Sequence, residues 1–320
     1  MAEKPQIIKE IEEEVEFFRD RYFTYDEPLP YKNWVLYPVK VKNYTEFLSS
    51  SACLTLNKND TFETIQMSHI DYLVSKLKDE KEGPLWSMRF SKILELCLHI
   101  DNGLRCQQCK KFMSFDDYIG KLQLLSAQAE KENRQLTEAE IQQALACECG
   151  GVYRQTVEYK LDEKTKHYNL ILDGNTMSDK EFNRVRKYIM YQNLPDFKDD
   201  SWVDKSVRDD QAAKAELLSR NQGEASLERK MVGLCIHTGY KLSEVCDLTT
   251  RKFLQLIGMI DDILDYTATK QGLMSGMVSL KKGATLEHWL YKKKTDSIYG
   301  AAKSADSYIN AIKNNGAVST

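Results

Sequence analysis

Apolar residues recur every three or four positions along most of the chain, which is the spacing of one helix face. In residues 6–22 the apolar positions share a face and glutamates occupy the others, so we predict an amphipathic helix there. Thr137 and Ser178 each precede a glutamate by three residues and form capping boxes, which mark two further helix starts. The same spacing predicts helices over residues 44–53, 68–77, 85–99, 115–129, 137–145, 178–194, 226–239 and 251–271.

A strand-like alternation of apolar and polar residues occurs in two parts of the chain. Val152–Leu161 and Tyr168–Leu172 alternate on either side of a polar turn and predict a β-hairpin that ends at Gly174. Trp34–Val41 predicts a short strand, which Pro38 restricts to a sheet edge or a bulge. The hairpin could extend that strand into a small sheet. The predicted fold class is therefore mainly α with a small β-hairpin or sheet (α+β).

Two cysteine pairs at the centre of the chain have the spacing of a zinc site. The first is Cys106-Gln107-Gln108-Cys109, and the second is Cys147-Glu148-Cys149-Gly150-Gly151, with one intervening residue where two are commoner. Four thiolates in two tight turns fit a tetrahedral zinc ion at about 2.3 Å, and glycine readily takes the positive φ that such a knuckle needs. We predict a structural zinc ion bound by Cys106, Cys109, Cys147 and Cys149. Four small buried thiols are the alternative interpretation.

The 37 residues between the two pairs are predicted to be almost wholly helical. Closing so long a loop costs only a few kcal/mol, whereas structural zinc supplies about 10–16 kcal/mol of apparent binding free energy. The metal would therefore staple a helical insertion onto a helical body. Four thiolates leave no open coordination position, so we expect no hydrolysis at the metal. His99 lies close to the first pair and is an alternative ligand, although a histidine that simply ends a helix is commoner.

Composition places the chain among ordinary globular proteins. Of its 320 residues, 42% are hydrophobic and 29% are charged, and a net charge of −3 gives no overall attraction to nucleic acid or to an anionic membrane. No apolar run reaches the ~18 residues of a bilayer span, and the N-terminus has no signal-peptide pattern. We therefore expect a reducing cytoplasm, where cysteines bind metals or stay free. The four other cysteines are predicted to pack in the core: Cys53, Cys97, Cys235 and Cys246.

The order of these elements divides the chain into four regions. Residues 1–105 form an N-terminal helical region with a short edge strand, 106–151 the zinc-knuckle helical insertion, 152–173 the β-hairpin and 174–320 a C-terminal helical region. Residues 1–20 are predominantly acidic and residues 281–320 predominantly basic. Termini of opposite charge could pair with each other or with neighbouring copies in an assembly.

Asp261-Asp262-Ile263-Leu264-Asp265, in the longest predicted helix, resembles the motif with which polyprenyl synthases bind diphosphate through magnesium. Asp261 and Asp265 share a helix face and could share a divalent ion. The other aspartate-rich motif, the paired arginine and the lysine-glycine site of those synthases are missing from the sequence, so a solvated acidic face is the simpler interpretation. A magnesium-dependent prenyl-diphosphate-type enzyme that uses Asp261, Asp262 and Asp265 is one alternative function.

Other catalytic signatures do not occur in the sequence. The serine-hydrolase elbow, the HExxH zinc site, the P-loop and the dinucleotide fingerprint are all absent, so we expect no enzymatic activity. Lysine runs at 281–282 and 292–294 could contact phosphate. They leave a zinc-bearing nucleic-acid adaptor as a second alternative, but no nucleic-acid fold signature accompanies them and we do not expect nucleic acid as a partner.

Three stretches spread over most of the chain form a recognisable set. They are Pro30–Val39 followed by Tyr44, Glu46 and Phe47; Tyr188–Asp196; and Ser275–Val278 with His288–Tyr291. The set resembles tail proteins of bacteriophages of Gram-positive hosts, in the group associated with baseplate hub assembly or tail-assembly chaperoning. The resemblance does not extend to the cysteine insertion.

The resemblance implies a non-enzymatic structural or assembly protein of the phage tail or baseplate. Its partners would be other tail and baseplate proteins, in an assembly of multiple copies and not at a membrane. It would occur in the host cytoplasm during assembly or in the tail baseplate of the virion. The expected contact surfaces are the cysteine-clamped insertion, Trp289 with Tyr291, and the acidic N-terminal helix, each of which could equally pack internally.

Overall fold

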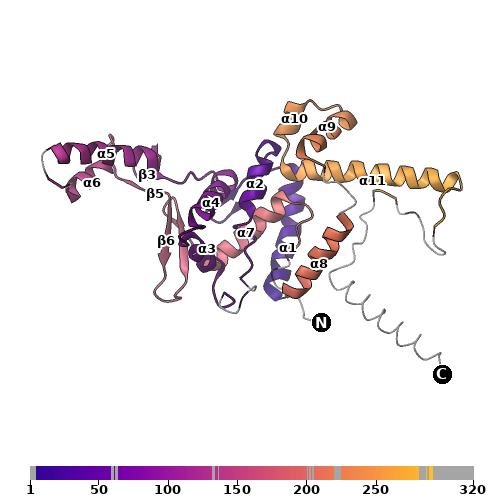
Figure 1. Cartoon of the computed structure of the whole chain (residues 1–320), viewed down its shortest axis with the longest axis horizontal. Helices are drawn as coiled ribbons and strands as arrows, with labels where there is room; N and C mark the ends of the chain where they lie inside the picture. The colour runs from indigo at the N-terminus through magenta and orange to yellow at the C-terminus, as the bar shows by residue number, and fades with distance from the viewer. Residues whose placement is uncertain are drawn as a thin grey trace, which may run out of the picture. The chain divides into compact units, whose positions relative to one another are not determined.

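The computed structural model describes residues 5–58, 61, 64–131, 134–135, 137–199, 201, 203, 205–219, 225–280, 286 and 288–290 (Figure 1). It contains two compact units, one comprising Gln6–Gln255 and the other containing the chain from Leu256 onward. The lysine runs at 281–282 and 292–294 and Tyr291 lie outside the described residues.

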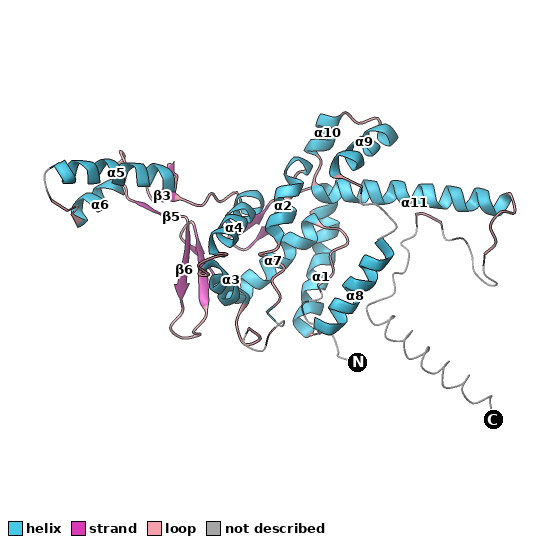
Figure 2. Ribbon diagram, viewed as in Figure 1, coloured by secondary structure: helices cyan, strands magenta, loops and turns pink. Residues whose placement is uncertain are grey.

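The protein is mainly helical with small antiparallel sheets, which confirms the predicted fold class (Figure 2). The chain begins with α1 (Gln6–Arg21), β1 (Leu29–Tyr31), β2 (Trp34–Leu36), α2 (Tyr44–Ser51), α3 (His69–Leu77) and α4 (Gly83–Leu98). After the central cysteines follow β6 (Val157–Leu161), β7 (Tyr168–Leu172), β8 (Asn175–Met177) and α7 (Asp179–Asn193). Among the described helices we find none whose length and hydropathy would let it span a bilayer.

Helix α7 runs through the main hydrophobic core. Every residue from Val185 to Asn193 is buried. The core packs around this helix and draws on α1, both early strands, α2 to α4, β7 and β8; its largest members include Ile11, Leu29, Leu36, Phe47, Leu73, Ile93, Leu172 and Tyr188. Residues of the predicted region 1–105 therefore share one core with α7. The four region boundaries stay a prediction.

Three buried polar residues of α7, Arg186, Gln192 and Asn193, bind backbone groups outside this helix. The Asn193 amide accepts a hydrogen bond from the Val39 N–H at 2.7 Å and donates one to the Ile189 carbonyl at 2.9 Å. Gln192 donates to the Leu36 carbonyl at 3.2 Å, and Arg186 donates to the Leu54 carbonyl at 2.6 Å. Two of the stretches that carry the sequence resemblance, 30–39 and 188–196, are therefore in direct contact and have an internal structural role.

The early strand pairs differently from our expectation. β2 forms an antiparallel hairpin with β1, in which Tyr31 pairs with Trp34 across a two-residue turn. Lys32 in this turn has a φ of 54°, the left-handed conformation that a tight hairpin turn requires. The expectation that the central hairpin extends the 34–41 strand is therefore wrong. After β2 the chain leaves the sheet, and the Tyr37 N–H donates to the Cys97 carbonyl instead.

The central hairpin has three strands and a shorter first strand than predicted. β6 pairs with β7 as expected, but Asp173 and Gly174 form a two-residue turn with φ of 47° and 82° that adds β8. Gly174 therefore turns the sheet and does not end it. Residues before Thr156 belong to another sheet. Thr156 separates the two sheets: its hydroxyl donates to the Asp101 carbonyl at 2.6 Å and accepts from the Gly103 N–H at 3.0 Å.

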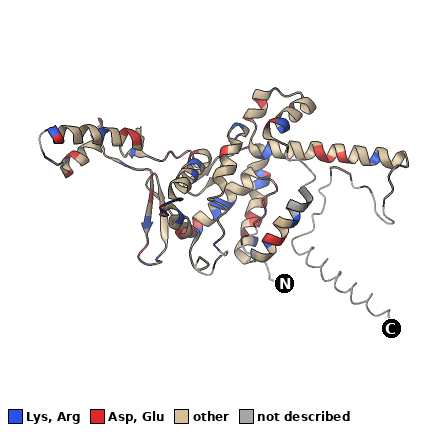
Figure 3. Ribbon diagram, in the orientation of Figure 1, with Lys and Arg blue, Asp and Glu red and all other residues tan. Residues whose placement is uncertain are grey.

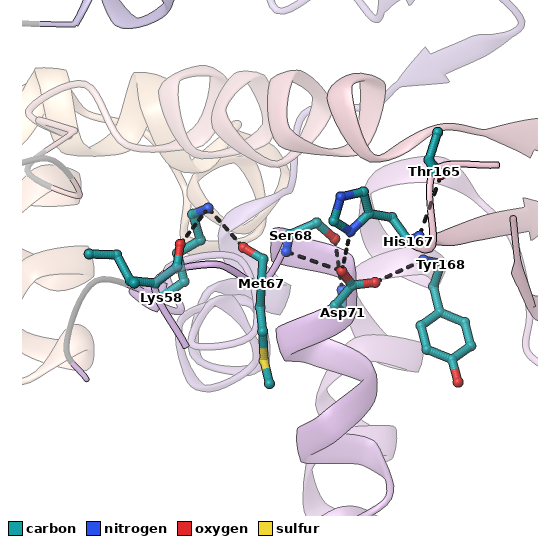
Figure 4. Close-up of polar contacts among 8 residues, drawn as sticks. Lys58, Met67, Ser68, Asp71, Thr165, His167 and Tyr168 are labelled. Carbon is teal, nitrogen blue, oxygen red and sulfur yellow. Dashed lines mark hydrogen bonds and ion pairs between the residues drawn. The ribbon is translucent and has the colours of Figure 1, made fainter. Parts of the chain in front are cut away.

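A capping network joins α3 to the β6–β7 turn (Figure 4). Ser68 and Asp71 form the capping box of α3, in which each side chain binds the backbone N–H of the other. The same Asp71 carboxylate accepts from the Tyr168 N–H at 2.8 Å and lies 2.6 Å from His167 Nδ1. Nearby, the Lys58 ammonium donates to the Met67 carbonyl at 2.8 Å. One carboxylate thus satisfies both a helix start and a strand start.

The acidic residues of α1 are only partly a solvated face. Arg184 of α7 forms ion pairs with Glu14 at 2.5 Å and Glu10 at 3.4 Å. The Tyr188 hydroxyl also donates to the Glu14 carboxylate. Part of this acidic face therefore packs internally and fixes α1 against α7.

The last third of the described chain is helical, as predicted. It contains α8 (Lys205–Ser219), α9 (Leu227–Thr238), α10 (Leu242–Asp247) and α11 (Thr250–Met274). The first turn of α11 belongs to the larger unit, in which the Thr250 N–H donates to the Val39 carbonyl at 2.7 Å and Arg251 donates to the Tyr191 carbonyl at 2.7 Å. Helix α11 ends at Met274, a few residues beyond the expected end at residue 271.

Candidate metal centre

A small three-stranded sheet carries the cysteines. Its strand order is β4-β3-β5, with β3 (Leu104–Cys106) in the middle, β4 (Phe112–Met113) and β5 (Tyr153–Gln155). The connection between β3 and β4 is the first knuckle: Cys106 ends β3, the Lys110 N–H donates to the Cys106 carbonyl at 3.1 Å, and Lys110 has a φ of 62°. This module, two knuckles on an antiparallel sheet, is called the ribbon below.

The second knuckle directly precedes β5. A bridge between Ala146 and Val152 closes it, and the Cys147 N–H donates to the Gly151 carbonyl at 2.8 Å. Gly150 has a φ of 85°, a backbone conformation that residues other than glycine rarely adopt. Register then places Cys106 opposite Tyr153 in the β3–β5 pair. The sheet pairing therefore brings together two knuckles that are far apart in sequence.

The four sulfurs form a compact group. All of them lie within 4.8 Å of one another, with Cys106 Sγ 3.5 Å from Cys149 Sγ and Cys109 Sγ 3.6 Å from Cys147 Sγ. A tetrahedron with sulfurs about 2.3 Å from a central zinc ion has edges of about 3.8 Å. The four cysteines named from the sequence thus lie close enough to bind a metal ion together. The interpretation as four buried thiols fits less well, because Cys109 and Cys149 are exposed.

The surroundings of two of the four sulfurs, those of Cys106 and Cys147, favour thiolates. The backbone N–H of Cys109 holds the pKa of Cys106 below its usual value, and the backbone N–H of Cys149, with the Tyr153 hydroxyl, lowers the pKa of Cys147 to about 6. At Cys109 the backbone N–H of Lys111 lowers the pKa, but the neighbouring thiols and desolvation raise it to about 12. Without a cation, negative charge on one sulfur opposes charge on the next. A divalent ion removes this conflict, and zinc suits a four-sulfur donor set.

The ribbon has a small core of its own beneath the sulfurs. Its buried residues are Leu104, Cys106, Met113, Cys147 and Tyr153, with Phe115, Tyr118 and Leu145 packed against them. The inserted helices α5 (Phe115–Lys131) and α6 (Glu138–Ala144) bury only Ala129 and Ala144 between them. The module is therefore held by the sheet and the sulfurs, whereas most of the insertion is surface.

Gly151 is needed where the second knuckle meets the first. A Cβ at this position would lie 2.8 Å from Cys106 Sγ and 2.9 Å from Gln108 Cβ. Gly151→Ala is therefore expected to weaken zinc binding by about 10- to 100-fold, the effect typical of changes that displace a ligand. Competition with a chromophoric chelator measures this affinity. Gly120→Ala, where a Cβ would meet nothing within 4 Å, should leave it unchanged; equal affinities for both variants contradict the knuckle geometry.

The other candidate ligands are not members of the four-sulfur group. His99 ends α4 with a φ of 55°, and its ring stacks on Tyr37 with centroids 3.7 Å apart. Asp261 and Asp265 are exposed on α11. Among the described residues, the four cysteines are the only group of three or more potential ligands close enough to share an ion.

The remaining cysteines divide into two pairs. Cys53 and Cys97 are buried in the main core, as predicted, and burial raises the pKa of both thiols, to about 12 for Cys53. Cys235 and Cys246 are only half-buried. The prediction of core packing is therefore wrong for these two, because α9 and α10 lie at the surface of their unit and have one buried apolar residue each, Leu234 and Val245.

A comparison with protein-family models gives one match. Residues 219–294, about a quarter of the chain, match the model described as YomV second domain, which belongs to a phage-derived protein family. The match covers α9, α10 and α11 and does not include Cys106, Cys109, Cys147 or Cys149. Searches of the curated proteins and of the solved structures found no match. The C-terminal part of the chain is thus similar to a domain of a phage-derived family.

Proposed function

We propose that this chain is a non-enzymatic structural or assembly protein of a bacteriophage tail or baseplate, with a structural zinc ion in its ribbon. The observation that carries the proposal is the match of residues 219–294 to a domain of a phage-derived family. The resemblance of 30–39 and 188–196 to tail proteins supports it independently, because these stretches lie outside the matched domain.

The metal centre supports a structural role for the metal. Four thiolates complete a tetrahedral shell, and a complete shell leaves no position for a substrate or an activated water. The ion would instead link the β3–β4 turn to the start of β5. Helices α5 and α6, which the ribbon holds, bury almost nothing. They would then be available to other tail or baseplate proteins, the partners that this function requires.

Deletion of the coding region from the parent phage tests the proposal. Electron microscopy of lysates should show filled heads without complete tails, and a plasmid copy of the gene should restore tails. Asp261→Asn/Asp265→Asn should restore them equally well, since no magnesium chemistry is involved. Normal infectious particles from the deletion phage contradict the proposal. Failure of the double aspartate variant alone would favour the prenyl-diphosphate-type alternative.

A nucleic-acid adaptor is the second candidate, because of an open hollow of about 760 Å³ beside the first knuckle. Its lining contains four basic side chains, Arg105, Lys110, Arg154 and Lys160, and two acidic ones, Glu158 and Asp173. Arg105 pairs with Asp173 at 3.1 Å, which leaves three cations against one carboxylate. Retention of the purified chain on immobilised DNA that falls steeply with salt and is lost in Lys110→Glu/Arg154→Glu would favour this function over the tail role.

A further inference from the structure

Strand β6 is an edge strand whose backbone is unpaired on one side. The order of its sheet is β6-β7-β8, so β7 covers one edge of β6, and no strand among the described residues covers the other (Figure 2). At five residues, β6 is the longest edge strand in the described sheets. A free edge of this length can pair with a further strand, which is why proteins usually cover or protect such edges.

The register with β7 shows which backbone groups of β6 are free. Directly after β6, the Asp162 N–H donates to the His167 carbonyl at 2.9 Å and continues the β6–β7 register. Residues that bond to the neighbouring strand alternate along an antiparallel pair with residues that do not. Val157, Tyr159 and Leu161 therefore direct their N–H and carbonyl groups away from β7. Within the described part of the chain, no group outside the sheet forms a hydrogen bond with them.

The two faces of β6 carry different side chains. Val157 and Tyr159 face inward and pack against the main core. Because side chains alternate along a strand, Glu158 and Lys160 lie on the outer face, and the basic position is coloured blue on β6 in Figure 3. Neither of these two residues forms an ion pair with another described residue. On the inner side, an open hollow of about 770 Å³ between β6 and the helices α3 and α4 leaves room for the side chains of a partner strand.

We propose that β6 pairs with β6 of a second copy of the chain, antiparallel and centred on Tyr159. In this register Tyr159 faces Tyr159 of the other copy, and Val157 faces Leu161 of the other copy. These are the residues whose N–H and carbonyl groups point outward, so the free backbone groups of each copy bond to those of the other. Two three-stranded sheets would become one continuous sheet. The pairing goes beyond the proposed tail function and does not depend on it.

Charge selects both this register and this partner. With Tyr159 at the centre, Glu158 of each copy lies directly opposite Lys160 of the other. These two residues form a non-hydrogen-bonded pair, the kind in which facing side chains come closest. A shift of two residues in either direction would place Glu158 opposite Glu158 or Lys160 opposite Lys160, and like charges directly opposite each other are unfavourable. Two-fold symmetry forms both opposite-charge pairs at once, so the strand is complementary to itself.

Sedimentation equilibrium of the purified full-length chain tests the pairing. The wild-type chain should be a dimer. Leu161→Pro removes an N–H that points away from β7 and should raise the dimer dissociation constant by about 10- to 100-fold, because two hydrogen bonds between the copies are lost. Leu161→Ala keeps the N–H, shortens a side chain that is 47% exposed, and should have a much smaller effect. A monomeric wild-type chain, or two variants that associate equally, overturns the proposal.

Charge exchange tests the register through exposed side chains and without a backbone change. Glu158→Lys and Lys160→Glu should each weaken the dimer by about tenfold or more, because both facing pairs then carry like charges. An equimolar mixture of the two variants should associate as a heterodimer, and the double variant Glu158→Lys/Lys160→Glu should match the wild type, since opposite charges face each other again. Single variants that associate as tightly as the wild type, or a mixture that stays as weak as its components, overturn the proposed pairing.

Discussion

Replacing Cys147 with serine is expected to abolish zinc binding and to unfold the ribbon while the main core stays folded. Cys147 is buried between the two knuckles, and its sulfur lies 3.6 Å from both Cys109 Sγ and the Tyr153 hydroxyl. Serine cannot supply the fourth thiolate. The ribbon would lose most of the metal's contribution, about 10–16 kcal/mol of apparent binding free energy in small zinc modules. Five buried residues are too few to replace it.

Hydrogen exchange followed by mass spectrometry measures this separation. Amides of β3, β4 and β5 should lose protection in Cys147→Ser, whereas those of α7 should keep it, because α7 lies in the main core. Cys235→Ser is the matched control: it removes a half-buried thiol outside the ribbon and should change neither region. Unchanged protection of β3 and β5 in Cys147→Ser would mean that the sheet does not depend on the metal.

Replacing Lys187 with methionine is expected to lower the free energy of unfolding by about 3–5 kcal/mol. Lys187 Nζ lies 2.5 Å from Asp199 Oδ2, and the two side chains are only 3% and 5% exposed. Methionine keeps most of the volume but leaves a buried carboxylate without its ammonium partner. Lys187→Met/Asp199→Leu should recover only part of the loss, since Asp199 also attracts Arg186. Urea unfolding of the three proteins gives these values; a fully stable single variant contradicts the buried pair.

The same ion pair predicts an acid limit to stability. Desolvation alone would raise the pKa of Asp199. The charge of Lys187 and the hydrogen bonds from Lys187 and Ser201 outweigh desolvation, so the pKa of Asp199 lies below the usual 3.8. A carboxyl whose pKa is lowered by folding contributes fully above its unfolded pKa and loses that contribution as the pH falls through the folded value. Stability should therefore fall below about pH 4. In Lys187→Met this fall should be smaller or reversed, because without Lys187 desolvation raises the pKa of Asp199, and a carboxyl whose pKa is raised by folding stabilises the fold as the pH falls.

Helix positions could be predicted from the sequence because their determinants are local. Ser68, Thr137 and Ser178 each form the capping box that begins a helix in the structure, within one or two residues of the expected start. The acidic positions of α1 were equally clear, but their partner Arg184 is on α7, far away in sequence. Spacing along one helix does not reveal which residues of another helix it meets.

Strand pairing could not be predicted in the same way. β1 contains Pro30 and has three residues, too few for an alternating pattern. The long alternating run from Val152 is divided at Thr156 between two sheets, a division that depends on side-chain contacts with Asp101 and Gly103. β3 and β4 were missed for the same reasons, although they form the first knuckle together.

The candidate site was found because its ligands occur as two close pairs in the sequence. What the sequence did not show was the sheet that brings the pairs together, or the Tyr153 hydroxyl beside Cys147.

X-ray absorption at the zinc edge of the purified full-length chain tests the central claim, that four cysteines hold one structural zinc ion. The structure predicts one zinc per chain with four sulfur neighbours at about 2.3 Å and no oxygen or nitrogen ligand. A chain that carries no zinc after purification with zinc in the medium, or a zinc ion with mixed nitrogen and oxygen ligands, would contradict the claim.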